Sequence, residues 1–220
     1  MLCGDPDYWS DEWTSSVEYI GDHYVLRKLL LSFETSPCAN TIGVSCVVLT
    51  SDDRWIISHR ASNLAFDPQS LGCSASGVLS WREPLCWSGR DVDTWIAKGI
   101  ARECMEELGV AVETEQIKYL AFAREFGRAG KPQFFFLFDL KQGVRGLSVT
   151  RLQTCWRMYG NKEHRNLFAL NGKQAEVLVG HDASAIRQLL KSLGPGKLKP
   201  SEELRMNLAL ALEYQQRSVA

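Results

Sequence analysis

The chain has 220 residues, of which 45% are hydrophobic and 23% are charged, and this balance excludes a generally disordered protein. Its 25 Lys and Arg and 26 Asp and Glu residues give a formal net charge of −1, which argues against general nucleic-acid binding. The length is about one and a half times that of a typical domain, so we expect one enlarged domain rather than two.

The cysteines and the first residues bear on the cellular compartment. The 7 cysteines are scattered and form no Cys-x-x-Cys pair, which is unfavourable for a disulfide framework or a zinc site. The acidic beginning of the chain lacks the basic and apolar regions of a signal peptide. No apolar stretch approaches the roughly 20 residues that a membrane span needs. The sequence therefore predicts a cytoplasmic protein with reduced thiols and no membrane partner.

The first part of the chain predicts a helical lead-in followed by strands. Residues 1–37 are acidic and contain a predicted helix near residues 18–31. A Trp- and Pro-containing insert occupies about residues 78–93. Between them, β-branched and aromatic side chains bounded by turn residues predict two strands, at residues 41–50 and 55–60. Residues 71–77 are a segment of small residues that ends in Gly and is a candidate for a short strand running into a loop.

The second part predicts a long helix, a hairpin and further helices. Apolar residues recur every four positions through residues 94–108 and predict a helix that Gly109 closes. A hairpin-like loop is predicted at residues 127–132. The other predicted elements are strands at residues 117–126, 133–140 and, less clearly marked, 167–170, and helices at about residues 181–193 and 202–216. This order predicts an α/β layered domain.

The helix predicted over residues 94–108 carries three carboxylates on one flank of its apolar stripe. On a helical wheel Glu107 falls within the apolar face, with Glu103 and Glu106 beside it. Like charges one turn apart repel each other, and a carboxylate at a buried edge is unfavourable without a partner. A divalent cation such as Mg²⁺ binds clustered oxygen ligands and neutralises them. The alternative is a solvated acidic helix end with salt bridges to Arg102 or Lys98.

Residues 102–110, Arg-Glu-Cys-Met-Glu-Glu-Leu-Gly-Val, resemble the second half of the Nudix box. That box reads Gly-x5-Glu-x7-Arg-Glu-U-x-Glu-Glu-x-Gly-U, where U is an aliphatic residue. The first half departs from it, because Thr94 and Ser88 stand where the box has Glu and Gly. Gly77 is the better candidate for the loop glycine, which places the insert inside the box. The departure therefore concerns the loop geometry more than metal binding.

The resemblance implies a fold and an activity. The fold is an α/β/α sandwich with a mixed central sheet over residues 38–180, with N- and C-terminal helical extensions at residues 1–37 and 181–220. The activity is Mg²⁺-dependent hydrolysis, with Mn²⁺ as an alternative metal, of the phosphoanhydride in a nucleoside diphosphate linked to a group X. A looser similarity of residues 121–136 to enzymes that hydrolyse UDP-sugars points to such a substrate.

Two other functions compete with this hydrolase. The first is a catalytically weak or inactive Nudix-like domain that senses a nucleotide, which the departure in the box favours. The second is an interaction domain that uses the Trp-rich insert and the terminal helices. The intact carboxylates favour the hydrolase, because a site without function has no need of a strained acidic cluster. In either nucleotide-binding case the partner is a small molecule, and the chain is a monomer or a homodimer.

The resemblance also assigns roles to residues of this chain. The metal ligands are Glu103, Glu106, Glu107 and the carbonyl of Gly77. The catalytic candidates are Glu106, Glu107 and Glu125, of which Glu106 or Glu125 accepts the proton of the attacking water. Arg102 and Gly109 support the box. The substrate-binding residues are Arg60, Arg124, Arg128 and Lys131, and the alternative for each is a solvated surface charge.

Overall fold

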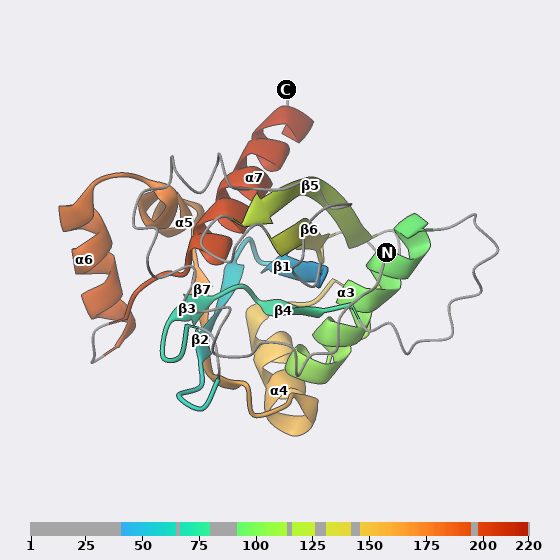
Figure 1. The fold of residues 1–220 in the computed structure, drawn as a ribbon. Coiled ribbons are helices and arrows are strands. Elements are labelled where there is room, and N and C mark those ends of the chain that lie inside the picture. The colour runs from blue at the N-terminus through green and yellow to red at the C-terminus, as the bar shows by residue number, and fades with distance from the viewer. Residues whose placement is uncertain are drawn as a thin grey trace, which may run out of the picture.

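The structure, a computed structural model, places one sheet between layers of helices (Figure 1). It describes residues 41–64, 67–79, 92–113, 116–125, 131–141, 146–194 and 198–219. The strands are β1 (Gly43–Leu49), β2 (Trp55–Arg60), β3 (Leu71–Gly72), β4 (Ala75–Val78), β5 (Ile117–Glu125), β6 (Lys131–Asp139) and β7 (His164–Leu170). The helices are α3 (Val92–Leu108), α4 (Val149–Tyr159), α5 (Gly172–Val179), α6 (Ala183–Leu193) and α7 (Glu202–Val219).

The sheet is mixed and has β1 near its centre. The strand order is β3-β2-β1-β6-β5, while β4 also pairs with β1 and β7 also pairs with β2. The pairing of β1 with β6 is parallel, and the other pairings are antiparallel. Every residue of β1 is buried, as is typical of a β-branched strand that is covered on both faces. The predicted α/β class and mixed central sheet are confirmed.

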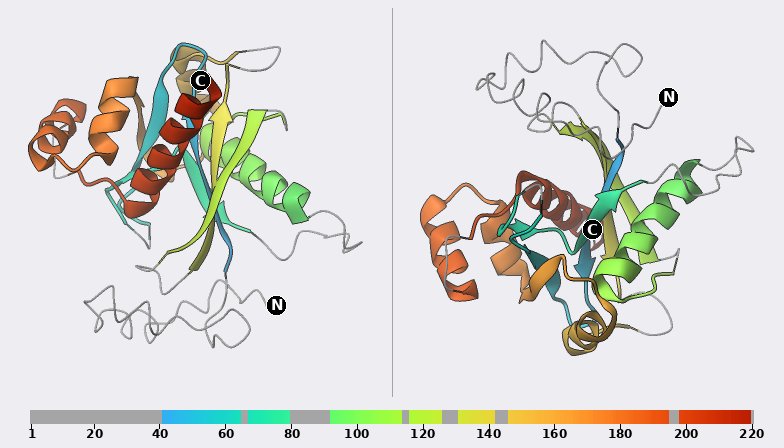
Figure 2. Two further views of the ribbon diagram at one scale, coloured as in Figure 1. Left: turned by 90° about the horizontal axis from the view of Figure 1, so that it is seen from above. Right: turned by 60° about the horizontal axis from the view of Figure 1, so that its bottom comes forward.

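Helices cover both faces of the sheet, and each face has its own apolar core (Figure 2). On one face, α3 and α4 pack on β1 and β6 through a core that includes Ile100, Leu108, Phe136 and Leu152. On the other face, α7 and α5 pack through a second core that includes Leu208. The predicted layering of helices on both sides of the sheet is therefore confirmed, while the predicted domain boundaries stay a prediction.

Most element predictions hold, with shifted boundaries. The predicted helix over residues 94–108 begins two residues earlier, at Val92. Lys131 and Pro132 belong to β6, where the sequence predicts a loop, because they pair with Glu125 and Arg124 of β5. The strand predicted at residues 167–170 begins earlier, at His164, where it pairs with β2.

Two helices, α4 and α5, have no counterpart in the sequence prediction. The α5 helix begins with a capping box, in which the Asn171 side chain accepts the Gln174 backbone N–H and the Gln174 side chain accepts that of Asn171. This spacing is a readable helix-start signal. The α4 helix follows Ser148, whose side chain makes no capping hydrogen bond. Serine is a common residue type at this position, but the sequence prediction did not use it.

Several sequence predictions fall on residues that the structure does not describe. The N-terminal lead-in, residues 1–37, and residues 80–91 of the insert lie outside the described residues. Within the described residues, no helix combines the length and the apolar character needed to cross a membrane. The cysteines with a described thiol are Cys46, Cys73, Cys104 and Cys155, and all are free.

Candidate functional site

The α3 helix is fixed in place by its apolar face and by its C-terminal glycine. Ile96, Ile100, Cys104 and Leu108 are buried in the core beneath α3. Gly109 has a φ of 68°, the left-handed conformation that ends many helices, and its N–H donates to the Met105 carbonyl at 3.1 Å. A Cβ on Gly109 would lie 2.7 Å from the Cys155 carbonyl oxygen of α4. A glycine here therefore lets α4 approach the end of α3.

Two carboxylates of α3, one helical turn apart, are buried. Glu103 is 7% exposed and Glu107 is 1% exposed. Burial raises the pKa of Glu103 to about 8, against the opposing charge of Arg102 and with a further rise from Glu107. Burial also raises the pKa of Glu107. The side chains that the sequence places on the apolar flank of α3 are therefore held where a negative charge is unfavourable.

Glu107 is held by donors from two strands. The backbone N–H of Ser76 in β4 donates to Glu107 Oε2 at 3.1 Å. The Nε2 atom of His164 in β7 lies 3.1 Å from the same oxygen. This Nε2 atom also lies 3.1 Å from the Ser74 carbonyl oxygen. The hydrogen bond from His164 works against the rise in the pKa of Glu107 that burial causes.

Gly77 lies directly against the Glu103 carboxylate. It pairs with Val44 in the β1–β4 ladder, and a Cβ added to it would lie 2.1 Å from the Glu103 Cδ atom. The neighbouring Val78 carbonyl accepts a hydrogen bond from Arg102 Nη2 at 3.3 Å. The predicted loop glycine and the predicted box arginine therefore both lie beside the buried carboxylates. The missing side chain at Gly77 is what leaves room for Glu103.

Glu106 is placed differently from Glu103 and Glu107. Its side chain is 50% exposed, and its Oε2 atom lies 3.2 Å from Arg102 Nη1. The other terminal nitrogen of Arg102 donates to Glu103 at 2.7 Å. The structure therefore groups Glu103 with Glu107 and leaves Glu106 at the surface beside Arg102. This arrangement contains the salt bridge to Arg102 that the alternative interpretation of the acidic helix end expects.

The donors around α3 fit a hard divalent cation in their chemistry. Glu103 and Glu107 offer carboxylate oxygens, and the Gly77 backbone lies close to the Glu103 carboxylate. A cation at this place would offset the desolvation that raises both pKa values. Within the described ranges, no three His, Cys, Asp or Glu side chains are arranged to hold a metal ion. Mg²⁺ commonly uses only one or two carboxylates and completes its shell with water and substrate phosphates.

Arg60, a predicted substrate-binding residue, contacts a neighbour of Glu107. It ends β2 and pairs with His164 of β7. Its Nη1 atom lies 3.4 Å from the Ser76 Oγ atom, and the Ser76 backbone in turn contacts Glu107. Arg60 and Glu107 are therefore connected through a single residue.

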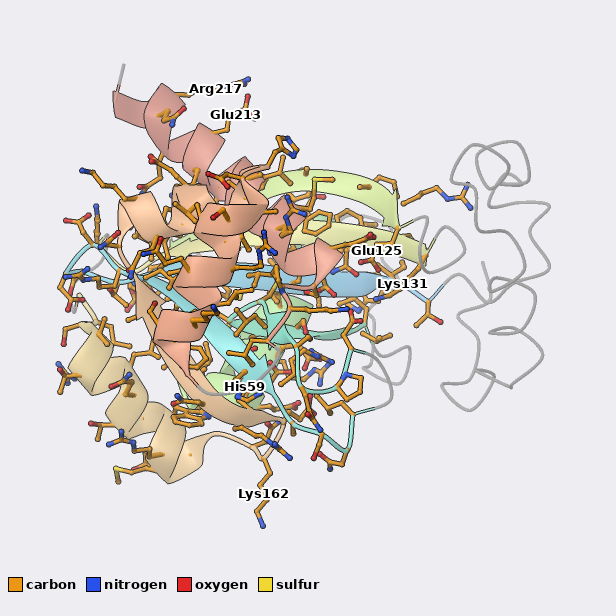
Figure 3. The ribbon with its side chains drawn as sticks, turned by 90° about the vertical axis from the view of Figure 1, so that its left-hand side faces the viewer. His59, Glu125, Lys131, Lys162, Glu213 and Arg217 are labelled. Atoms are coloured by element: carbon orange, nitrogen blue, oxygen red, sulfur yellow. The ribbon has the colours of Figure 1, made fainter. Side chains whose placement is uncertain are left out.

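Glu125 and Lys131 lie together where β5 ends and β6 begins, as Figure 3 shows. Lys131 Nζ is 3.8 Å from Glu125 Oε2 and 3.0 Å from Gln133 Oε1. Gln133 Nε2 contacts Ser45 Oγ at 3.1 Å and, at 3.4 Å, Glu203 of α7. This second polar cluster therefore lies on the α7 face of the sheet, whereas Glu103 lies on the α3 face.

The remaining predicted residues and two further ones complete the site description. Arg124 lies in β5 opposite Pro132, and Arg128 lies outside the described residues. Sequence reasoning missed Glu163, whose charge raises the pKa of both Glu103 and Glu107. It also missed His164, because its neighbours in the sequence form no recognisable motif with it.

Comparisons with known proteins give matches of fold at low sequence identity. No protein-family model matches the sequence, and a search of curated proteins finds no match. One similar solved structure is a bifunctional NMN adenylyltransferase/ADP ribose pyrophosphatase from Francisella tularensis, complexed with AMP and a manganese ion. The identity is 14%, the match covers 92% of this chain and 47% of that chain, and the TM-score is 0.47.

Two further similar structures come from other bacteria. A MutT/nudix family protein from Enterococcus faecalis is 16% identical, with 74% of this chain and 56% of that chain covered and a TM-score of 0.42. A Nudix hydrolase from Nitrosomonas europaea is 15% identical, with 73% of this chain and 92% of that chain covered and a TM-score of 0.39. The match thus spans 47% and 56% of the Francisella and Enterococcus proteins. At these identities and TM-scores the likeness assigns no activity to this chain.

Proposed function

We propose that this chain is a Nudix-type hydrolase that cleaves, with Mg²⁺, the phosphoanhydride of a nucleoside diphosphate linked to a group X. One observation carries this proposal. Glu103 and Glu107 are buried one turn apart on α3 and have raised pKa values. Glu103 lies against Gly77, where any side chain would collide with its carboxylate. They stand in residues 102–110, which resemble the second half of the Nudix box. Without a cation, this burial of acidic groups is unfavourable and has no evident use.

Glu103, Glu107 and the Gly77 carbonyl would hold the metal, Mg²⁺ or alternatively Mn²⁺. The bound metal would neutralise phosphate oxygens and make its water more acidic. Glu103 now contacts Arg102 at 2.7 Å. Arg102 would hold Glu103 through this contact until metal arrives, and Glu106, which is half-exposed beside Arg102, is the third candidate ligand.

A carboxylate near the attacking water would accept its proton. Glu106 is the better candidate, because it lies on α3 and its side chain is 50% exposed to solvent and therefore to substrate. Glu125 is less well supported, because its partner Lys131 joins it to the cluster on the α7 face. Glu107, with two donors on one oxygen, is better suited to hold the metal than to move a proton.

Basic side chains would bind the phosphates of the substrate. Arg60 is the best supported, because it reaches Ser76 and through Ser76 lies close to Glu107. Arg124 of β5 remains a candidate, as does Arg128, which lies outside the described residues. Lys131 is buried and contacts Gln133, so a phosphate would have to replace that contact.

The products would be a nucleoside monophosphate and phosphorylated X, and a UDP-sugar is the substrate class we favour. This preference comes from the resemblance of residues 121–136 to enzymes that hydrolyse UDP-sugars. A cytoplasmic location and a monomeric or homodimeric state are part of the same proposal. The location is inferred from the scattered cysteines of the chain.

A hydrolysis screen tests the proposal. The full chain is incubated with UDP-sugars, ADP-ribose, dinucleoside polyphosphates, capped RNA and deoxynucleoside triphosphates, with Mg²⁺ or with EDTA, and the products are separated by anion-exchange chromatography. We expect Mg²⁺-dependent release of a nucleoside monophosphate from at least one nucleoside diphosphate compound. Hydrolysis that is equally fast in EDTA contradicts the proposal. Nucleotide binding without hydrolysis of any compound would instead support the sensor domain.

A further inference from the structure

We infer that His164 is a positioning residue for Glu107: it binds one oxygen of this carboxylate and leaves the other oxygen for the metal. The inference rests on the proposed function and deepens it. His164 is the first residue of β7, and Glu107 is in the last turn of α3, so the contact joins two elements that are far apart in the sequence. Their side chains are each 1% exposed, and the contact is therefore shielded from water.

The position of the hydrogen on the imidazole follows from its two neighbours. His164 Nε2 lies 3.1 Å from Glu107 Oε2 and 3.1 Å from the Ser74 carbonyl oxygen. A carbonyl oxygen can only accept a hydrogen bond, so the contact with Ser74 requires a hydrogen on Nε2, and an ionised carboxylate likewise only accepts. The Nε2 atom therefore carries the hydrogen and shares it between two acceptors. The ring orientation is fixed by this pair of contacts.

The other ring nitrogen indicates that His164 does more than fill space. His164 Nδ1 is buried and has no hydrogen-bond partner among the described residues. A buried polar atom without a partner is unfavourable, and an apolar side chain of similar size would avoid it. The arrangement is thus suited to one task, which is to present Nε2–H to Glu107.

The donors on Glu107 are distributed unevenly. The Ser76 N–H and the His164 Nε2–H both reach Oε2. Among the described contacts, no hydrogen bond reaches Oε1. A carboxylate that is held at one oxygen by two donors has a fixed plane, and its second oxygen keeps its lone pairs for another ligand. His164 therefore sets the direction in which Glu107 meets a cation.

The tautomer of His164 is a test that needs no metal and no substrate. Long-range ¹H–¹⁵N correlation spectra of the metal-free full chain report which ring nitrogen carries hydrogen, with His164→Gln identifying the resonance. We expect hydrogen on Nε2 in the wild-type chain and a change in these ring signals in Glu107→Gln. A hydrogen on Nδ1 with Nε2 bare overturns the inference.

Metal affinity tests the consequence of the contact. Mn²⁺ binding to the full chain is measured by electron paramagnetic resonance for the wild type, His164→Leu and His164→Gln. Loss of a partner of a metal ligand commonly weakens metal affinity about 10–100-fold, which we expect for His164→Leu. In His164→Gln the side-chain amide can take the place of Nε2–H, so we expect affinity within about threefold of the wild type, since the donor is kept.

Failure of this inference can be told from failure of the proposed function. Wild-type Mn²⁺ affinity in His164→Leu, together with loss of binding in Glu107→Gln, overturns the role of His164 and leaves the proposed function standing. Unchanged Mn²⁺ affinity in Glu107→Gln contradicts the proposed function itself. Equal loss in His164→Leu and His164→Gln, with both variants folded by circular dichroism, overturns the inference too, because only the leucine variant lacks the donor.

Discussion

The Nε2 atom of His164 lies 3.1 Å from Oε2 of Glu107, and both side chains are 1% exposed. Together with the Ser76 N–H, this contact anchors one carboxylate of α3 to β4 and to β7 at once. The neighbouring carboxylate, Glu103, is held instead by Arg102 and lies against Gly77. Both acidic side chains thus lie against β4, but Glu103 is paired with an arginine of its own helix and Glu107 with a histidine of β7.

The first prediction concerns Glu103 and pH. Because its pKa is raised from 4.5 to about 8, Glu103 takes up a proton on folding between these pH values. The contribution of Glu103 to the free energy of unfolding of the metal-free wild type should therefore be most favourable below pH 4.5. This contribution should be lost as the pH rises through about 8. Glu103→Gln should remove this loss, which is on the order of a few kcal/mol.

Urea denaturation in EDTA at a series of pH values measures this effect. The control is Glu176→Gln, because Glu176 is an exposed glutamate of α5. We expect the control to follow the wild type and Glu103→Gln to be the more stable protein at pH 8. The same pH dependence in Glu103→Gln and wild type would show that Glu103 is not held in an unfavourable ionised state.

The second prediction concerns Gly77. Since a Cβ there would lie 2.1 Å from the Glu103 Cδ atom, Gly77→Ala should displace the carboxylate. We expect a loss of about 1–3 kcal/mol in the free energy of unfolding, from overpacking. Catalytic efficiency should fall by about tenfold or more, because the metal ligand moves. Gly172→Ala is the matched control, because nothing lies within 4 Å of a Cβ at that position. Wild-type activity in Gly77→Ala would contradict the placement of Glu103.

The third prediction concerns the end of α3. Gly109 has a φ of 68°, and its added Cβ would lie 2.7 Å from the Cys155 carbonyl oxygen. Gly109→Ala should therefore lower the free energy of unfolding by about 1–3 kcal/mol through backbone strain and crowding. Thermal unfolding followed by circular dichroism, again beside Gly172→Ala, measures the loss. An unchanged unfolding temperature would mean that α3 and α4 are not in close contact at this point.

The fourth prediction concerns Arg60. If Arg60 binds a substrate phosphate, Arg60→Ala should raise KM by about tenfold, the effect of losing one charged hydrogen bond, and change kcat less. Steady-state kinetics on the best substrate of the hydrolysis screen give both constants. Arg187→Ala in α6 is the control, since Arg187 is exposed and bonds only to the Ala183 carbonyl among the described contacts. A KM equal in Arg60→Ala and wild type would exclude phosphate binding by Arg60.

The sequence predicted the parts of the site that have a periodic or local signal. The four-residue spacing of apolar side chains places Glu107 on the buried face of α3, and the glycine after the helix has the positive φ that a helix end favours. The Asn171–Gln174 capping box is an equally local signal that predicts the start of α5. Local chemistry of this kind can be read without knowing the fold.

Other features depend on contacts between distant segments and could not be read. His164 meets Glu107 because β7 pairs with β2, a contact between segments that are far apart in the sequence. Lys131 looks like a loop residue before a proline, yet it pairs with Glu125 and starts β6. Glu106 carries the same charge as its neighbours on α3, but its side chain is 50% exposed, whereas Glu103 and Glu107 are buried by the strands that pack on α3. Such choices between partners are made by the tertiary structure.

The central claim is that the buried carboxylates of α3 hold a metal for hydrolysis of a nucleoside diphosphate compound. The most direct measurement compares Mg²⁺-dependent hydrolysis by wild type, Glu107→Gln and the control Glu176→Gln, with metal-free thermal stability as a second readout. We predict that Glu107→Gln loses activity by at least about 100-fold, because a metal ligand is removed. Its metal-free stability should equal or exceed that of the wild type, because a buried acidic group becomes neutral. Hydrolysis by Glu107→Gln at the wild-type rate would contradict the claim.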